Sequence, residues 1–536
     1  MNALALIRVS RLAALIGAAY GALLPMSAAA QRFADIDTAT VDYALAELTP
    51  TKQCADLART LPNDVLELNA TAIRQSEQAP AHCRVSGLID PEIAFEVSLP
   101  AGWNGRFYMI GNGGHAGESL SDAGRVAERN DALMHGFAFA QTNTGHFASE
   151  EPGASFVLSN PQKAIDYAYR AVHLTATTAK AITADYYGQA VEHAYWNSCS
   201  NGGRQGLIEA QRYPDDFDGI IANAPWLDQT GFTIGAIWNQ QALTETPLTN
   251  AKMELVAERV MAVCDATDGL ADGLIDDPRN CDFDPARDVP VCPAGAGSDS
   301  CLSPAEAATI ARIYSGVTSN GEPFFPGFMP GSEQITSLFG GGAGSGWMNV
   351  IVPQQPGGRA ADFNLADNTM KYLVFNPPQP DWDFRTFDFD QDPGLLTNWG
   401  ALADAKNLDL SAFRERGGKL LMTYGWADAI LQPLMGVNYY ERASARNGAG
   451  TENFFRLFMV PGMAHCSGGI GPDQHDSVTA IIDWVEADRA PDSIVARKIV
   501  DGDTVRSRPL CPYPQVARYD GTGSIDTAEN FSCENP

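Results

Sequence analysis

Ser200 lies in a run of small and polar residues that could support attack on an acyl carbonyl, Trp196-Asn197-Ser198-Cys199-Ser200-Asn201-Gly202-Gly203. A serine hydroxyl attacks a carbonyl when a base removes its proton. Such a serine is often presented on a sharp strand-to-helix turn between small residues. The segment from Ser198 to Gly202 has this form, with Ser198 where glycine is usual. Ser200 is therefore the predicted nucleophile.

Asp428 and His465 are the predicted acid and base. Each follows a predicted strand, since Asp428 comes after Lys419 to Tyr424 and His465 comes after Phe454 to Val460. The partners of a serine on such a turn follow it in the order acid, then histidine, on loops after later strands. The separation of Asp428 and His465 along the chain suits one helix and one strand between them.

Five other residues could take these two roles. Asp404, Asp409 and Asp473 also lie in the C-terminal half, but none of them directly follows an apolar strand. His475 lies in a polar run that is more typical of the start of a solvated helix. His146 precedes the serine and breaks the expected order, so it is expected to be structural or to line the pocket.

A glycine run is the second element of the predicted site. Backbone amides must point at the negatively charged oxygen that develops during the attack. One amide is expected to be that of Asn201, directly after the nucleophile. The other is expected from Gly111-Asn112-Gly113-Gly114, where missing side chains let a substrate oxygen approach, with Gly113 and Gly114 as candidates. The alternative for this run is a plain turn.

Strands and helices alternate in the segments that carry these residues. Apolar stretches predict strands, and apolar residues at spacings of three or four predict helices. The predicted strands are Arg106 to Ile110, Phe137 to Thr142, His193 to Asn197, Ile220 to Ala224, Lys419 to Tyr424 and Phe454 to Val460, and the predicted helices are Pro161 to Tyr187, Gly206 to Tyr213, Pro433 to Ala445 and Ser477 to Ala487. The alternation predicts an α/β protein with a mostly parallel sheet, helices on both faces and the α/β-hydrolase fold.

The stretch between Ser200 and Asp428 is longer than the sheet needs. After about residue 228 the sequence contains glycine and proline clusters, at Phe324 to Gly331, Gly340 to Gly346 and Pro377 to Pro380. We therefore expect residues 31–228 and 397–536 to form the catalytic domain. Residues 229–396 are expected to form a large inserted lid domain.

The first thirty residues predict a signal peptide. Arg8 and Arg11 precede an apolar stretch from Leu12 to Leu24, and Ala28-Ala29-Ala30 offers a cleavage site. The apolar stretch is short for a bilayer, and no later segment reaches roughly 18 uninterrupted apolar residues. We expect residues 1–30 to be removed from a secreted or periplasmic protein, the alternative being a retained N-terminal anchor.

The net charge of the chain excludes some partners. The sequence has 65 acidic and 36 basic residues, which gives a formal charge of -29 at pH 7. A protein this acidic repels phosphate backbones and anionic membrane surfaces. We therefore expect no nucleic-acid partner and no membrane partner.

The ten cysteines predict disulfides, because an exported chain meets an oxidising compartment and the even number leaves no obligatory free thiol. Cys199 and Cys466 adjoin Ser200 and His465, so a bridge between them would tie the serine turn to the histidine loop. The alternative is that Cys199 is itself the nucleophile, although its thiol would be oxidised in this compartment. Sequence neighbours suggest the other pairs, Cys54–Cys83, Cys264–Cys281, Cys292–Cys301 and Cys511–Cys533.

Asp265, Asp268 and Asp272 lie in an acidic run of the predicted lid. Clustered carboxylates repel one another unless water or a hard cation separates them, and calcium prefers carboxylate and carbonyl oxygens. Together with the carbonyls of Leu270 and Leu274, the three carboxylates could surround one ion. The spacing is not that of an EF-hand, and a solvated acidic loop is the simpler expectation from these residues alone.

The chain resembles the tannase and feruloyl esterase family, which includes hydrolases of the mono(2-hydroxyethyl) terephthalate type. In that family a Cys-Ser pair and a His-Cys pair flank the active site, and the two cysteines are bonded. The resemblance therefore implies a Cys199–Cys466 disulfide, and it implies a structural calcium ion in the lid at Asp265, Asp268, Leu270, Asp272 and Leu274. It covers nearly the whole mature chain and is carried by Gly111 to Gly114, Trp196 to Gly206, Tyr213 to Gly219, Gly425 to Asp428 and Gly462 to Cys466.

The resemblance also implies a serine carboxylic ester hydrolase that acts on esters of aromatic acids through an acyl-enzyme. A separate expectation, which the charge does not decide, is a monomer that acts on a small-molecule aromatic ester. Feruloyl (hydroxycinnamoyl) esters are the first expectation, and galloyl esters or mono(2-hydroxyethyl) terephthalate-type monoesters are the alternatives. A peptidase on the same fold is the runner-up among enzymes, and a non-catalytic polyphenol- or carbohydrate-binding protein is the alternative from another class. Trp347, Trp382 and Phe339 could stack on an aryl ring, although a role in the core explains each of them equally well.

Overall fold

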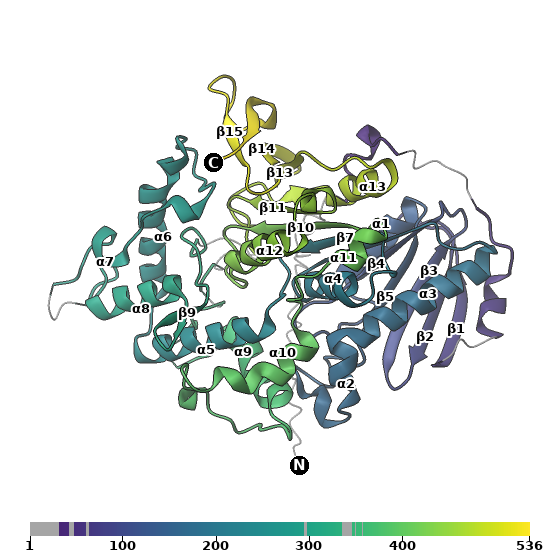
Figure 1. Ribbon diagram of the computed structural model, residues 1–536, viewed down its shortest axis with the longest axis horizontal. Helices are drawn as coiled ribbons and strands as arrows, with labels where there is room; N and C mark the ends of the chain where they lie inside the picture. Colours follow the sequence, from purple (N-terminus) through teal and green to yellow (C-terminus); the bar gives the residue numbers. More distant parts are fainter. Residues whose placement is uncertain are drawn as a thin grey trace, which may run out of the picture.

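The main sheet of the computed structural model has nine strands within the described part of the chain (Figure 1). The structure describes residues 32–41, 48–59, 64–293, 297–334, 346–348, 350–355 and 357–536. The predicted signal peptide, residues 1–30, lies outside the described residues. The strand order is β1-β2-β3-β5-β4-β6-β7-β10-β11. The strands are β1 (Val65–Ile73), β2 (His82–Ile89), β3 (Ile93–Pro100), β4 (Arg106–Ile110), β5 (Ala138–Thr142), β6 (His193–Cys199), β7 (Gly219–Asn223), β10 (Lys419–Gly425) and β11 (Phe455–Val460).

The sheet is parallel from β5 to β11, whereas β1, β2, β3 and β5 pair antiparallel. Every residue of β4 and β5 is buried, as expected for parallel strands that are covered on both faces. Within β4, Phe107 and Met109 join one hydrophobic core and Tyr108 and Ile110 join the other. The predicted α/β architecture is confirmed, while the antiparallel strands β1 to β3 have no counterpart in the sequence predictions.

Helices cover both faces of the sheet. Side chains of α3, α4 and α12 contribute to the core on one face, and those of α1 and α13 contribute to the core on the other. The predicted helix Pro161 to Tyr187 is interrupted by a π-helical turn, η4 (Asp166–Arg170), and α4 begins at Asn201 rather than at Gly206. The helices are α1 (Ala123–Met134), α2 (Gln162–Ile165), α3 (Ala171–Tyr187), α4 (Asn201–Arg212), α12 (Pro433–Asn447) and α13 (Ser477–Ala487).

Between β7 and β10 the chain leaves the sheet and forms a group of helices, drawn in teal to green in Figure 1. Buried apolar side chains between Leu243 and Val352 form a core of their own there, whereas Phe232 to Ile237 of α5 join the core of the sheet. The helix α5 therefore links the two cores. The elements are α5 (Gln229–Glu245), α6 (Asn250–Cys264), α7 (Pro285–Asp288), α8 (Pro304–Ser315), β8 (Val317–Ser319), β9 (Glu322–Phe325), α9 (Ala361–Asn368), α10 (Thr397–Ala403) and α11 (Ser411–Glu415).

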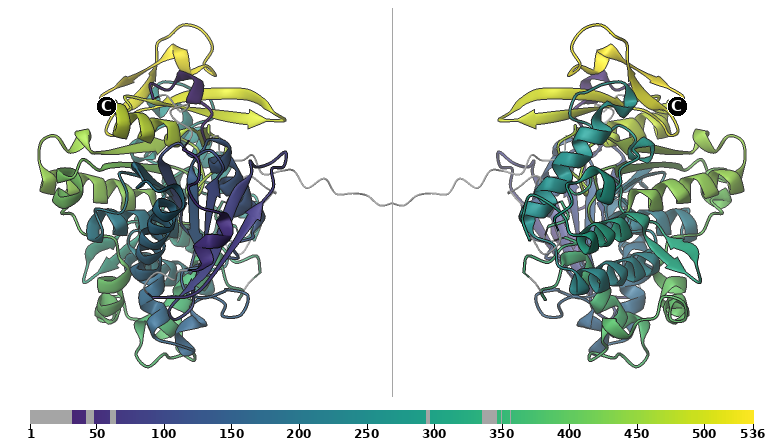
Figure 2. Two further views of the ribbon diagram at one scale, coloured as in Figure 1. Left: turned by 90° about the vertical axis from the view of Figure 1, so that its right-hand side faces the viewer. Right: turned by 90° about the vertical axis from the view of Figure 1, so that its left-hand side faces the viewer.

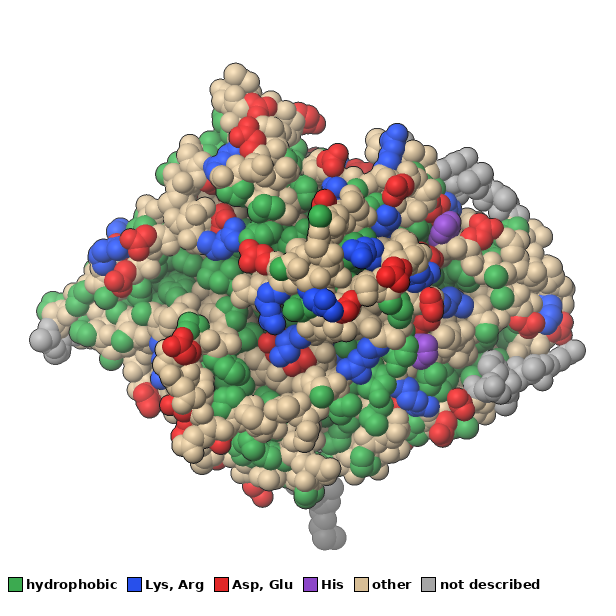
Figure 3. Space-filling view, viewed as in Figure 1, with side chains coloured by type: hydrophobic (Ala, Val, Ile, Leu, Met, Phe, Trp, Pro, Cys, Tyr) green, Lys and Arg blue, Asp and Glu red, His purple; other side chains and the backbone are tan. Residues whose placement is uncertain are grey.

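The C-terminal part of the chain forms small sheets at one end of the molecule, drawn in yellow in Figure 2. Figure 3 shows acidic, basic, polar and hydrophobic side chains interspersed on one face. Within the segments that the structure describes, no helix combines the length and the apolar character needed to cross a membrane. The strands are β12 (Gln474–His475), β13 (Ile494–Val500), β14 (Asp503–Leu510), β15 (Val516–Tyr519) and β16 (Phe531–Glu534).

All ten cysteines lie in described segments, and none of them is free. One disulfide, Cys199–Cys466, joins two segments that are far apart in the sequence, with a separation of 267 residues. The other disulfides close short loops, namely Cys54–Cys83, Cys264–Cys281, Cys292–Cys301 and Cys511–Cys533. These are the pairs expected from the sequence and from the family resemblance.

Candidate active site

Ser200 lies at the turn between β6 and α4. Its backbone has φ 62° and ψ -124°, a conformation that residues other than glycine rarely adopt. The Ser200 N–H donates to the carbonyl of Asn223 at 3.0 Å, and the Ser200 carbonyl accepts from the N–H groups of Trp226 and Arg204 at 2.9 and 3.0 Å. The strand end therefore holds this residue in the sharp turn that a serine nucleophile requires.

Close packing around the turn explains its glycines. A Cβ on Gly203 would lie 2.6 Å from the carbonyl oxygen of Asn223, and one on Gly111 would lie 2.8 Å from the Cα of Gly202. A Cβ on Gly202 would lie 1.9 Å from the Ser198 hydroxyl oxygen. Ser198, which replaces the usual glycine, therefore fits only because residue 202 has no side chain.

His465 and Asp428 form a buried pair in the loops after β11 and β10. The His465 Nδ1 and the Asp428 Oδ2 are 2.8 Å apart, and neither side chain is more than 2% exposed. The other carboxylate oxygen of Asp428 accepts from the N–H groups of Ile430 and Leu431 at 2.8 and 2.9 Å. These amides orient the carboxylate, and the carboxylate in turn orients the imidazole ring through its Nδ1.

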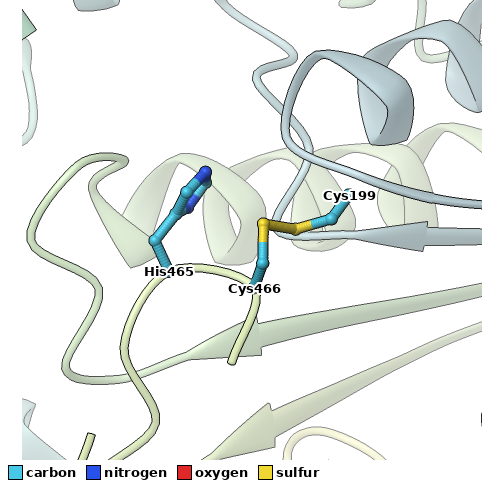
Figure 4. Close-up of side chains that lie close together, drawn as sticks. All are labelled: Cys199, His465 and Cys466. Carbon is cyan, nitrogen blue, oxygen red and sulfur yellow. A yellow bond between two sulfur atoms is a disulfide. The ribbon is translucent and has the colours of Figure 1, made fainter. Parts of the chain in front are cut away.

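The Cys199–Cys466 disulfide joins the turn of Ser200 to the loop of His465 (Figure 4). The Cα atoms of the two cysteines are 5.9 Å apart. A ring nitrogen of His465 and the two sulfur atoms all lie within 4.8 Å of one another. Since both sulfurs belong to the disulfide, Cys199 has no thiol, and the group is not available to a metal ion.

The glycine run from Gly111 to Gly114 lies against the start of α4. The N–H of Asn112 donates to the side chain of Gln205 at 3.0 Å, and the N–H of Gly113 donates to the carboxylate of Glu118 at 2.7 Å. The N–H of Gly114 has no acceptor among the described residues. Of the two glycines considered from the sequence, Gly114 is therefore the one with an amide left for a substrate oxygen.

Tyr167 connects the glycine run to the start of α4, and no sequence pattern pointed to it. It lies fully buried in the π-helical turn η4, and such turns are frequent at functional sites. Its hydroxyl accepts from the side chain of Gln229 at 2.8 Å and lies 2.9 Å from the Gly114 carbonyl and 3.1 Å from the Asn201 Oδ1. The Tyr167 hydroxyl has one proton to donate. Because the Asn201 Oδ1 already accepts from Arg204 at 2.7 Å, we assign this proton to the hydrogen bond with the Gly114 carbonyl oxygen.

The rival histidines have other partners. The His475 Nδ1 lies 2.8 Å from the hydroxyl of Ser477, and burial lowers the pKa of His475 to about 4. His146 stacks on Phe156 with ring centroids 4.2 Å apart, and burial lowers its pKa to about 4 as well. Both rings are placed as structural groups.

The rival acids are paired with basic side chains. Asp404 lies 2.8 Å from Lys406, and Asp473 lies 3.0 Å from Lys498. Asp409 pairs with Arg446 at 3.0 Å at the surface. Within the described residues, Asp428 is the carboxylate that contacts His465.

The aromatic residues considered for substrate binding differ in their surroundings. Trp347 is fully buried in the core between Leu243 and Val352, so it is not available to a ligand. Trp382 lines a surface cavity of about 440 Å³. Phe339 lies outside the described residues.

A separate groove of about 630 Å³ follows α6 and is lined by Met261, Ala262, Gln334 and Ile470 among others. Ile470 belongs to the same loop as His465. The volume lies within the range of roughly 300–1,000 Å³ that is typical of small-molecule sites. None of Ser200, Asp428 and His465 lines this groove, so it is not assigned to the candidate active site.

In the acidic run of the inserted segment, aspartate side chains accept hydrogen bonds from backbone N–H groups of the same run. The Asp265 Oδ1 accepts from the N–H of Asp272 at 3.1 Å. The Asp268 Oδ1 accepts from Leu270 at 2.8 Å, and the Asp272 Oδ1 accepts from Leu274 at 3.1 Å. The five residues named from the sequence thus belong to one compact loop.

The charges of this loop are only partly balanced. Burial and neighbouring carboxylates raise the pKa of Asp268, and they raise that of Asp276 to about 7. Arg508 pairs with Asp272. A hard cation would relieve the remaining repulsion, and the all-oxygen donor set suits calcium. Asp265, Asp268 and Asp272 do not form a group of ligand atoms within 4.8 Å of one another among the described residues, so the ion stays a prediction.

Comparisons with known proteins identify the family to which the chain belongs. A sequence model of the family described as "Tannase and feruloyl esterase" matches residues 77–534. The chain is 35% identical to an esterase from Xanthomonas campestris pv. campestris, over 92% of this chain and 93% of that protein. It is 34% identical to the mono(2-hydroxyethyl) terephthalate hydrolase of Piscinibacter sakaiensis, over 87% of each chain.

A solved structure is also similar over nearly the whole chain. The crystal structure of feruloyl esterase B from Aspergillus oryzae superposes with a TM-score of 0.77 at 27% identity. The match covers 90% of this chain and 100% of the other. The α/β fold with its large inserted segment is therefore the fold of that esterase.

Proposed function

This chain belongs to the tannase and feruloyl esterase family and is a carboxylic ester hydrolase, and on that premise we propose that it cleaves esters of aromatic acids with Ser200, His465 and Asp428. Feruloyl (hydroxycinnamoyl) esters are the proposed substrates. One observation carries the proposal, namely that the bonded pair Cys199–Cys466 adjoins both Ser200 and the His465 ring that Asp428 orients at 2.8 Å.

The acylation step begins with proton transfer from the Ser200 hydroxyl to the His465 Nε2 as the serine oxygen bonds to the ester carbonyl carbon. Asp428 keeps the proton of the imidazole on Nδ1 and stabilises the imidazolium that forms. The amides of Asn201 and Gly114 are the proposed donors to the tetrahedral oxyanion. When the intermediate collapses, the alcohol leaves with the proton from His465 and the aromatic acyl group stays on Ser200.

The deacylation step repeats this chemistry with water. His465 takes a proton from a water molecule, whose oxygen attacks the acyl carbon. The second tetrahedral intermediate collapses, the proton returns to the Ser200 oxygen, and the aromatic acid is released. The net reaction is ester plus water to acid plus alcohol, and no further reactant is needed.

A variant of the nucleophile tests this mechanism. Ser200→Ala is expected to lower kcat on methyl ferulate by at least about 10⁴-fold, because removal of one member of such a triad costs on that order. The matched control is Ser198→Ala, which changes a neighbouring serine hydroxyl and should keep most of the activity. A Ser200→Ala protein with near wild-type turnover would sink the assignment.

The choice of substrate needs a comparison of rates. Relatives named "Probable feruloyl esterase B-1" support hydroxycinnamoyl esters, and the relative named mono(2-hydroxyethyl) terephthalate hydrolase supports the second candidate. We expect kcat/KM to be highest for methyl ferulate among methyl ferulate, methyl gallate, mono(2-hydroxyethyl) terephthalate and a peptide anilide. A higher value for either of the other esters would reassign the substrate while leaving the mechanism intact.

Export is the last part of the proposal. Residues 1–30 have the pattern of a signal peptide, and the disulfides suit an oxidising compartment. The mature protein is then expected to begin at Gln31. Mass spectrometry of the protein recovered from the periplasm or the medium measures this end, and a chain that keeps residues 1–30 would contradict it.

A further inference from the structure

A second group of ionisable side chains lies at the opposite end of α4 from Ser200. It consists of His173 in α3, Glu209 in the last turns of α4, and Asp216 in the loop before β7. One ligand atom of each residue lies within 4.8 Å of the ligand atoms of the other two. Glu209 is about 14 Å from Ser200 along the helix axis, at the helical rise of ~1.5 Å per residue. The group is therefore separate from the proposed catalytic residues.

Glu209 is a buried acid that faces a second carboxyl group. Its residue is 1% exposed, no fixed N–H or O–H donor among the described residues reaches its carboxylate oxygens, and its side-chain hydrogen-bond partner is the carboxyl of Asp216. Two ionised carboxylates can only accept hydrogen bonds. The pair therefore needs either a shared proton or a cation between its oxygens.

His173 adds a nitrogen ligand to these oxygens. Its Nδ1 lies 2.6 Å from the Asp216 Oδ2, and its ring stacks on Tyr213 with centroids 3.8 Å apart. The side chain of His173 is 28% exposed, so a cation can reach it from solvent. Lys180 lies 3.5 Å from the other oxygen of Asp216, so it leaves Oδ2 to the group. Imidazole nitrogen selects transition metals such as zinc over calcium and magnesium.

We propose that His173, Glu209 and Asp216 bind one divalent transition-metal cation, with Zn²⁺ as the probe and water as the fourth ligand. Zinc bonds to nitrogen and oxygen are about 2.0–2.2 Å long, so ligand atoms at the observed spacing converge with small side-chain rotations. The cation joins α3, the end of α4 and the loop before β7. This site differs in position and chemistry from the predicted calcium loop, which offers only oxygens.

Calorimetric titration with Zn²⁺ tests the proposal on the full-length mature protein without an affinity tag, in saturating calcium. We expect one Zn²⁺ per chain at neutral pH. Thiols do not compete, because all cysteines are bonded.

Variants locate the bound ion. His173→Gln and Glu209→Gln are each expected to abolish the stoichiometric binding of Zn²⁺. His135→Gln is the matched control, because His135 also lies near a carboxylate, that of Asp131 at 3.6 Å, and this variant should bind as the wild type does. His173 is partly exposed, so its variant should fold, and near-ultraviolet circular dichroism checks this.

Two results would overturn the proposal. Absence of Zn²⁺ binding by the wild type would mean that the carboxylates share only a proton. Binding that survives both His173→Gln and Glu209→Gln would place the ion elsewhere. Both readouts are independent of the ester hydrolysis proposed above, so a failure of one proposal leaves the other standing.

Discussion

The Tyr167 hydroxyl holds the backbone of Gly114 in the proposed oxyanion site. This hydroxyl lies 2.9 Å from the carbonyl of Gly114, whose amide is the proposed second donor. We expect Tyr167→Phe to lower kcat on methyl ferulate by about tenfold with little change in KM, since tenfold corresponds to roughly 1.4 kcal/mol of lost transition-state stabilisation. Steady-state kinetics measure this.

The matched control for that variant is Tyr187→Phe. The Tyr187 hydroxyl is also buried and donates to the carbonyl of Pro100 at 2.6 Å, on an element outside the candidate site. Its loss should reduce stability without a selective loss of kcat. Equal kcat values for the two variants would remove the positioning role of Tyr167.

The buried carboxyl group of Asp362 should make the stability of the protein depend on pH. Burial raises its pKa to about 8, so the folded protein keeps this proton up to about pH 8, while the unfolded chain loses it near pH 4. The folded state therefore binds more protons between these values, and the free energy of unfolding falls as the pH rises, by up to about 1.4 kcal/mol per pH unit. Asn at this position cannot titrate.

Denaturant unfolding of Asp362→Asn at several pH values tests the sign. The variant should gain stability relative to the wild type as the pH rises from about 5 to 8. Asp215→Asn is the control, because the Asp215 side chain is 94% exposed. Parallel pH profiles for the wild type and Asp362→Asn would contradict the prediction.

For individual residues, the sequence predicts those that directly follow a strand. It does not predict residues whose role depends on the geometry of an irregular loop or turn. Ser200, Asp428 and His465 are predicted because each follows an apolar strand. Tyr167 and Glu118 could not be identified. The role of Tyr167 depends on a π-helical turn, and that of Glu118 depends on a hydrogen bond to Gly113 within an irregular loop.

Among the elements, the Cys199–Cys466 disulfide is the connection that should matter most for activity. We expect the double variant Cys199→Ala/Cys466→Ala to lose activity by about 10²-fold, because small displacements of catalytic groups cost on that order. The loss should appear in kcat for methyl ferulate while the circular dichroism spectrum stays close to that of the wild type.

A second pair of cysteines supplies the control. The Cys292–Cys301 disulfide closes a short loop in the inserted segment, with a separation of 9 residues. Its double alanine variant should lose stability but keep kcat. Comparable losses of kcat in the two double variants would show that the bridge beside Ser200 has no special role.

Predicted elements match the structure where the sequence has a clear period. The helix Ser477 to Ala487 and the strand Arg106 to Ile110 have the predicted bounds. The helix α5 is buried along most of its length, so it lacks the apolar stripe that identifies a surface helix. The strand β1 has an irregular burial pattern rather than a strict alternation, which hides it in the same way.

For the whole molecule, the predicted calcium ion should affect the stability of the inserted segment. Removal of calcium with EGTA is expected to lower Tm by several degrees, because a ligand that binds only the folded state stabilises it. Excess calcium should restore the value, and Asp268→Asn should lose this response. Differential scanning calorimetry measures it.

The control variant for calcium is Asp282→Asn, whose side chain is 93% exposed and lies outside the five proposed ligands. It should respond to EGTA as the wild type does. If EGTA does not change the Tm of the wild type, the acidic loop does not bind calcium and is a solvated loop.

The Cys199–Cys466 bond also determines how the molecule behaves when its chain is cut. Cys199 and Cys466 are 267 residues apart in the sequence, so their bond closes a covalent ring. The chain within this ring includes the inserted segment and Asp428. A single proteolytic nick in that segment would leave Ser200 on one fragment and His465 on the other, yet the fragments would remain one molecule. Nicked protein should therefore run as one band on a gel without reductant and as two bands with it. The inserted segment could therefore be cut and reshaped while the proposed nucleophile and base stay tethered to each other.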